Sequence, residues 1–501
     1  MSSDEAKLAQ EASEELEATT SDADAFKKAF ETVVNPRTDD AREEASNAVS
    51  AFVKQAMENQ AVVSDDLMDT IATLTSAIDS KLTAQVNEIL HNEEFKQLES
   101  AWTGLEHLVV SADPDSTTKV KVLNVSKDEL REELMAPGGM EQRPLYKKIY
   151  SAEYNSANGN PYGVLIGDYQ FDNSDGDVTV LTKIGEIAQS AHAPFLSSAA
   201  PGLMGFDDFS ELTGADKLDF LIPDDSPEYA KWFGLRDNEI SRYIALTAPN
   251  VMARSPYGPN SSKQVKEFDF VEDVDGHDNK KYAWMNSAFA MGANIAKAHK
   301  EHGWTTRIRG VRSGGMVKGL PMHVFETGGG QRDAKCPIQV AMDNDREAEF
   351  SSHGLIGLQH RKNTDTAAFI GAQTLYKPSK GRTDEEKASD RLSARLPYIF
   401  AVSRFSHYLK MMIHDMVGES KEHEQLEREL TSWIKKYIPA NPSTASEAEK
   451  ARKPLADARV EVVEDEENPG YYHSRFYLRP HFQLEGMTVG MTLVSKMPDP
   501  K

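Results

Sequence analysis

The spacing of apolar positions changes character several times along the chain. From about Asp66 it becomes helical, and one group of large apolar side chains recurs at steps of three and four residues. This stripe predicts a helix that faces the domain core, and its members are Phe95, Leu98, Trp102, Leu105 and Val109. Further on, Ser126 and Glu129 have the spacing of a capping box, which predicts that the next helix begins there.

Strand-like segments alternate with helical ones through the middle of the chain. Residues 119–125 alternate between polar and apolar side chains, which predicts a half-buried strand. We expect Asp175-Gly176 to form a turn. Further strands are predicted at 163–169, 193–198 and 242–247, and helices at 178–191 and 283–298. This alternation is typical of an α/β body with at least one mixed sheet.

The composition changes near Tyr376. Residues 377–390 are polar and interrupted by Pro and Gly, which predicts a linker between domains. A helix is expected around 408–415, and a second one, Leu426–Tyr437, carries a core stripe that includes Leu430 and Trp433. The predicted domains are an acidic, mainly helical arm (1–65), an α/β body (66–376), the linker (377–390) and an α+β domain (391–501).

Three segments near the end of the chain alternate between mainly apolar and mainly polar positions. They predict an antiparallel meander with one apolar face, which the Leu426–Tyr437 helix would cover. The last of these strands, Thr488–Ser495, contains no Pro or Lys before Lys496, so its edge is not blunted. Its own chain can cover this edge, or a strand from another subunit can pair with it.

The charge of the chain is concentrated at one end. The sequence has 80 acidic residues against 56 Lys and Arg, a formal net charge of -24. Residues 1–80 hold 18 acidic and 6 basic residues, so they account for half of that net charge. This balance argues against binding to a nucleic-acid backbone, which needs clustered Lys and Arg. The arm is either a solubilising tail or a docking element that orders in an assembly.

The expected location follows from three simple features. Cys336 is the single cysteine, which excludes an internal disulfide and fits a reducing compartment. No apolar run approaches the ~18–20 residues that a membrane span requires. The first residues have neither the basic nor the apolar part of a secretory signal. We therefore expect a cytoplasmic protein that does not insert into membranes.

Motifs for catalysis, cofactors and metals are incomplete. Gly314 and Gly319 have the outer spacing of a phosphate loop, but Leu320 and Pro321 follow where Lys and Ser or Thr are required. A partial calcium loop near Asp273 lacks two carboxylate ligands. No zinc pattern accompanies the lone cysteine. We expect no catalytic, cofactor-binding or metal-binding residues, with an α/β enzyme of dispersed active site as the less favoured alternative.

Several stretches in order resemble the large sheath subunit of type VI secretion systems (the TssC family, also called VipB). The resemblance runs from about residue 65 to 496, and residues 1–60 match least. The stretches that carry it are His91–Leu108, Lys121–Lys127, Ala191–Phe195, Leu320–Glu326, Arg395–Tyr398, Arg404–Lys410 and Arg479–Phe482.

The resemblance implies a mechanical function. Members of this family pair with a smaller sheath subunit (TssB/VipA-like) and stack as hexameric rings into a helical sheath around an inner tube protein, above a baseplate. Contraction of the sheath propels the tube and its spike. A recycling AAA+ unfoldase acts on contracted sheath, mainly through the small subunit. A sheath protein of another contractile injection device is the alternative.

The resemblance also implies a phage-tail-sheath-like C-terminal domain whose sheet accepts strands from other subunits. It therefore favours an open edge at the end of this chain. The residues that we expect to take part in strand exchange are Thr488, Val489, Gly490, Met491, Thr492, Leu493 and Val494, with Phe476 and Leu478 on the preceding strand.

Overall fold

The computed structural model describes most of the chain from residue 67 onward. The described residues are 67–154, 159–258, 268–327, 330–378, 390–416, 423–464 and 472–481, with the isolated positions 47, 261, 265, 266, 383 and 483. They form two compact units. The smaller unit contains α3 (Leu67–Leu90) and the segment Tyr257–Asp273, and the larger unit contains His91–Pro256 and everything from Val274.

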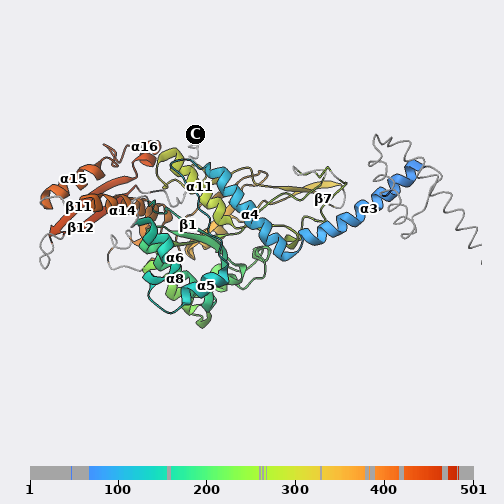
Figure 1. The fold of residues 1–501 in the computed structure, drawn as a ribbon, viewed down its shortest axis with the longest axis horizontal. Helices are drawn as coiled ribbons and strands as arrows, with labels where there is room; N and C mark the ends of the chain where they lie inside the picture. The colour runs from blue at the N-terminus through green and yellow to red at the C-terminus, as the bar shows by residue number, and fades with distance from the viewer. Residues whose placement is uncertain are drawn as a thin grey trace, which may run out of the picture. The chain divides into compact units, whose positions relative to one another are not determined.

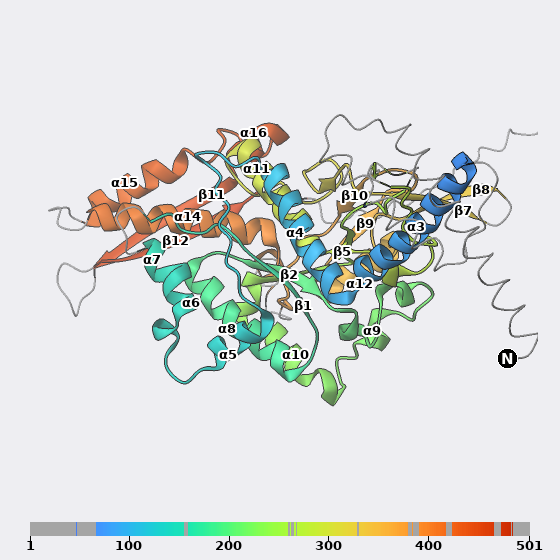
Figure 2. The same cartoon turned by 45° about the vertical axis from the view of Figure 1, so that its right-hand side comes forward.

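The larger unit is built on a six-stranded mixed sheet, which agrees with the fold class expected from the sequence (Figures 1 and 2). The strands follow the order β1-β2-β3-β9-β10-β6, so β1 lies at one edge. The first four are parallel, whereas β10 is antiparallel to both of its neighbours. The strands are β1 (Leu165–Phe171), β2 (Phe195–Ala199), β3 (Ile244–Ala248), β9 (Leu355–His360), β10 (Ala367–Phe369) and β6 (Met316–Val317).

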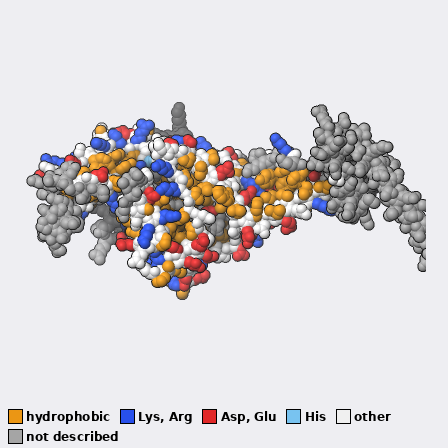
Figure 3. Space-filling model, in the orientation of Figure 1, with side chains coloured by type: hydrophobic (Ala, Val, Ile, Leu, Met, Phe, Trp, Pro, Cys, Tyr) orange, Lys and Arg blue, Asp and Glu red, His pale blue; other side chains and the backbone are white. Residues whose placement is uncertain are grey.

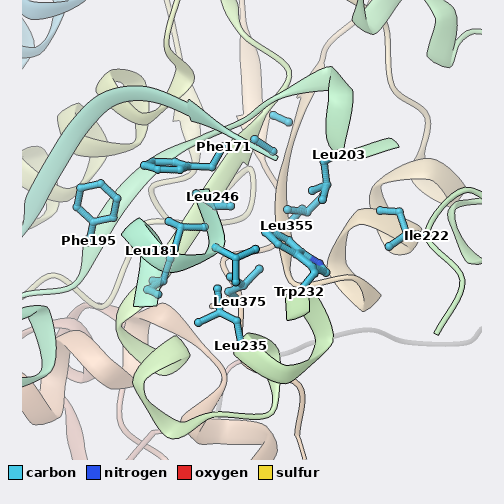
Figure 4. Packing of buried hydrophobic residues seen from close by; sticks show 14 of the residues in the cluster. Phe171, Leu181, Phe195, Leu203, Ile222, Trp232, Leu235, Leu246, Leu355 and Leu375 are labelled. Atoms are coloured by element: carbon cyan, nitrogen blue, oxygen red, sulfur yellow. The ribbon is translucent and has the colours of Figure 1, made fainter. Parts of the chain in front are cut away.

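Helices cover both faces of this sheet. On one face, α8 (Asp175–Ala191) and α10 (Ala230–Arg236) enclose a core whose large side chains include Phe171, Leu181 and Trp232 (Figure 4). On the other face lies α11 (Ser287–His302). Alternate residues of β3 enter the two cores, as the period of two in a strand requires. The helix α4 (Glu93–Ala112) packs against α11 as an outer layer.

The C-terminal part is a small α+β arrangement. The strands β11 (Leu455–Glu464) and β12 (Tyr472–Pro480) are antiparallel, with Val460 opposite Phe476. As the alternation predicted, most of their apolar side chains share one face, and this face packs against α14 (Leu396–Met416) and α15 (His423–Lys435). The short helix α16 (Glu447–Arg452) precedes β11.

Shorter elements complete the described fold. The helices are α5 (Lys127–Met135), α6 (Pro144–Tyr146), α7 (Ala152–Tyr154), α9 (Leu218–Leu221) and α12 (Asn344–Ser352). The strands β4 (Val251–Met252) and β5 (Trp284–Met285) form one two-stranded sheet, and β7 (His323–Thr327) and β8 (Gln331–Lys335) form another. Within the described ranges, no helix has the length and apolar character needed to cross a membrane.

Two local predictions are wrong, and a neighbouring one is confirmed. Among the described residues, 119–125 form no strand and pair with none, and Val122 is 67% exposed. Asp175 and Gly176 form the first turn of α8 instead of a loop, because an acidic residue is favourable at a helix N-terminus. The capping box is present: Ser126 accepts from the backbone N–H of Glu129, whose carboxylate accepts from the Ser126 N–H.

Candidate assembly surfaces

The helix α4 packs through a row of mostly small residues. Its buried side chains recur every four residues and are Lys96, Ser100, Gly104, Leu108 and Ala112. A Cβ atom at Gly104 would lie 2.4 Å from a ring carbon of Phe289 in α11. The absence of a side chain at this position therefore lets the two helices approach closely.

The large apolar stripe of α4 lies on the opposite side, which corrects the prediction from the sequence. Phe95, Leu98 and Trp102 are 37%, 57% and 65% exposed, and Leu105 alone of the expected set packs at the edge of a core cluster. Periodicity identifies a stripe but not the side that meets the core, and here the small-residue row allows the closer contact. The larger unit thus presents adjacent exposed apolar side chains along α4, in the region where Figure 3 shows hydrophobic surface.

Buried polar contacts hold α4 in place. Lys96 donates from Nζ to the carbonyl oxygen of Lys280 at 2.5 Å. The Nε atom of Arg254, which is 5% exposed, donates to Glu99 Oε1 at 2.6 Å. Charge-assisted bonds of this kind are stronger than neutral ones. The helix that carries the exposed apolar stripe is therefore firmly held in the larger unit.

The second surface is the two-stranded sheet of the C-terminal part. Leu430 is 1% exposed, and Trp433 packs against the same cluster of side chains. Phe476 and Leu478 point from β12 toward this cluster, so their side chains fill the covered face. Among the described residues, β12 pairs with β11 alone. The expected exchange residues Thr488–Val494 lie outside the described residues, so strand exchange there remains a prediction.

Within the described ranges, no three His, Cys, Asp or Glu residues gather in a way that could hold a metal ion. Burial raises the pKa of Cys336 to about 11, so its thiol is protonated at neutral pH and is a weak nucleophile.

A pair of histidines, His407 buried and His192 half-buried, joins the body to α14. The ring centroids of His192 and His407 are 6.2 Å apart, and a ring nitrogen of His407 lies 3.0 Å from the carbonyl oxygen of Ala191. Burial lowers the pKa of each imidazole to about 4, so both are neutral at pH 7. The sequence does not indicate this pair, because the two residues are far apart in the chain.

Two family models match most of the chain. The model described as EvpB/VC_A0108, tail sheath N-terminal domain, matches residues 72–376. The model described as EvpB/VC_A0108, tail sheath gpW/gp25-like domain, matches residues 385–497.

One known protein matches the chain over nearly its whole length. The type VI secretion system sheath protein TssC1 of Pseudomonas aeruginosa (strain PAO1) is 46% identical over 498 residues, which cover 99% of each chain. Among solved structures, a chain of the anti-feeding prophage baseplate matches with a TM-score of 0.39 and 10% identity, covering 76% of this chain and 84% of that one. A chain of the contracted anti-feeding prophage sheath matches with a TM-score of 0.30 and 13% identity, covering 63% and 66%. From the two family models and the sequence identity, the chain belongs to the VipB/TssC family of type VI secretion system contractile sheath proteins.

Proposed function

We propose that this chain is the large subunit of a type VI secretion sheath that pairs with a small sheath subunit in the bacterial cytoplasm. The pairs polymerise as stacked rings of six around an inner tube, starting from a baseplate, and contraction drives the tube and spike outward. The observation that carries this proposal is the 46% identity with TssC1 across 99% of both chains.

The mechanism is mechanical and requires no bond chemistry from this chain. Contraction repacks rigid subunits between two arrangements, and the free-energy difference between these arrangements supplies the work. Two well-packed cores on the faces of the mixed sheet support a rigid body of this kind. The hinge would lie in residues 377–390, between the body and the C-terminal domain.

Strand exchange would keep neighbouring subunits connected during this movement. The proposed edge is Thr488–Ser495, next to β12 in the chain. Each main-chain hydrogen bond contributes about 0.5–1.5 kcal/mol net, and several bonds in one ladder resist peeling together. The exposed stripe of α4, with Leu98 and Trp102 at its centre, is a second candidate contact between subunits.

Recycling of contracted sheath by an AAA+ unfoldase would act mainly through the small subunit, so no residue of this chain is assigned to it. A structural role without catalysis is consistent with the sheath family.

Co-expression with the small sheath subunit tests the proposal. The expected result is a complex with one copy of each chain that co-purifies and sediments as large particles. Recovery of this chain as a monomer, with the small subunit absent from the purified fraction, would contradict the proposed pairing.

A further inference from the structure

A loop of the body, residues 304–309, is built into the C-terminal part. Trp304 is 6% exposed and belongs to the core cluster of that part. Its ring stacks on Phe405 of α14, with the centroids 4.6 Å apart, and meets Tyr437 edge-on at 5.3 Å. Ile308 of the same loop is fully buried in the core on the α11 face of the mixed sheet. Because the loop contributes to both cores, its position relative to both is fixed.

Gln483 attaches the chain to this loop three residues after the end of β12. Its side-chain Nε2 donates to Thr306 O at 2.8 Å, and its Oε1 accepts from Arg309 Nε at 2.8 Å. Its main-chain N–H donates to the hydroxyl of Tyr398 in α14 at 2.9 Å. Arg309 and Tyr398 are 7% and 5% exposed, so these bonds are shielded from water. We call the three bonds the Gln483 clasp.

The clasp requires the carboxamide of glutamine. Thr306 O is an acceptor and the Nε–H of Arg309 is a donor, so the side chain between them must supply one donor and one acceptor. A glutamate has no N–H to donate to Thr306 O, and a methionine of similar length makes neither bond. The contact is therefore specific to the residue type and is more than close packing.

The chain just before the clasp is held by the C-terminal part itself. The N–H of His481 donates to Pro454 O at 3.1 Å, and its Nε2 lies 3.1 Å from Lys453 O. Two residues later, Gln483 bonds to the body loop. Residues 377–390 already connect the body to the C-terminal part along the chain. The Gln483 clasp is thus a second, non-covalent connection, and it lies where the last segment of the chain begins.

We propose that Gln483 is a positioning residue for strand exchange: the clasp fixes the start of the last segment on the body loop and so determines where Thr488–Ser495 can reach a neighbouring subunit. Thr488 is five residues beyond Gln483, and an extended chain spans at most ~3.6 Å per residue, so Thr488 stays within about 18 Å of the clasp. Without the clasp, the nearest attachment among the described residues is His481, and the limit rises to about 25 Å. The inference rests on the proposed function, because that function supplies the exchanged strand.

This difference in reach gives the size of the expected effect. The effective concentration of a tethered segment falls as the volume that it can reach grows. An increase in radius from about 18 to about 25 Å enlarges that volume roughly 3-fold, so each strand should find its neighbour ~3-fold less often. The heterodimer concentration at which half of the material sediments as sheath should therefore rise at least ~3-fold when the clasp is lost.

Gln483→Met tests the clasp, because it removes both side-chain bonds at nearly unchanged length. We expect this variant to pull down the small subunit like the wild type but to need at least ~3-fold more heterodimer for assembly. Gln331→Met, at an exposed position of β8, makes the same chemical change without touching the clasp and should assemble like the wild type. Equal assembly thresholds for the two variants would overturn the proposal.

A second control separates position from stability. Ile222 is 1% exposed in the body core, so Ile222→Val lowers the stability of the chain without touching the clasp. We expect its assembly threshold to equal that of the wild type. If Ile222→Val raised the threshold as much as Gln483→Met does, stability alone would explain the effect and the proposal would be overturned.

Hydrogen exchange on the unassembled chain tests the clasp directly. The amide of Gln483 should be protected in the wild type, and Tyr398→Phe, which removes its acceptor, should speed its exchange at least ~10-fold. A wild-type Gln483 amide that exchanges as fast as in an unfolded peptide would overturn the proposal. A wild-type chain that forms no sheath with the small subunit would refute the proposed function itself. Normal wild-type assembly with an unchanged threshold in Gln483→Met would refute only the role of the clasp.

Discussion

The contact between α4 and α11 gives a quantitative test of the packing. Gly104→Ala places a methyl group 2.4 Å from the Phe289 ring, which is 7% exposed and has little room to move. Overpacking of this kind costs about 1–3 kcal/mol, whereas replacing a helical glycine by alanine gains about 1 kcal/mol in propensity. The net expectation is a loss of roughly 0–2 kcal/mol in the free energy of unfolding.

The same substitution at Gly234 is the matched control. Gly234 lies in α10, and a Cβ atom there would meet nothing within 4 Å. Gly234→Ala should therefore stabilise the chain by up to about 1 kcal/mol, so that the two variants differ by about 1–3 kcal/mol. Urea unfolding of the two variants, monitored by circular dichroism, measures this difference.

A double variant identifies the cause. Phe289→Leu shortens the group that the new methyl meets, so Gly104→Ala should cost less in that background, with a coupling of about 0.5–3 kcal/mol. If Gly104→Ala were as stabilising as Gly234→Ala in the wild-type background, the close approach of α4 and α11 would be refuted.

Three further predictions concern assembly and pH. Val489→Pro or Thr492→Pro should abolish sheath assembly seen by electron microscopy, because each removes a main-chain hydrogen-bond donor from the strand. Pull-down should still recover the pair with the small subunit. Sheaths of normal length would contradict the proposed strand exchange. Trp102→Ser should leave the melting temperature of the isolated chain nearly unchanged, because the side chain is 65% exposed. It should reduce the amount of assembled sheath that sediments. A large loss of stability would show that the stripe is buried. His192 and His407 have folded-state pKa values of about 4, below the ordinary 6.5, so the stability they contribute is present above pH 6.5 and lost as the pH falls toward 4. His407→Gln should flatten that part of the stability curve measured by urea unfolding, and an unchanged curve would contradict the assignment.

Features that depend on local sequence were predicted well. The capping box at Ser126 and Glu129 uses atoms three residues apart, and it forms as expected. The alternation in β11 and β12 determines which face is apolar, and Val460 and Phe476 lie on that face, opposite each other. Both features are specified by side chains close in sequence or by a strict period of two.

Features that depend on contacts between residues far apart in the sequence were not predicted correctly. The apolar stripe of α4 has the correct period, but Gly104 and its neighbours in the small-residue row meet α11, a contact that periodicity cannot specify. Residues 119–125 have strand-like alternation, but a strand forms only where a neighbour supplies the ladder.

The most direct test of the central claim is electron microscopy of this chain co-expressed with its small sheath subunit. We expect hollow tubules whose cross-section shows rings of six heterodimers around a central channel wide enough for an inner tube. Co-purified pairs that remain single heterodimers at every concentration and salt condition, with no tubules, would contradict the assignment of a sheath-forming function.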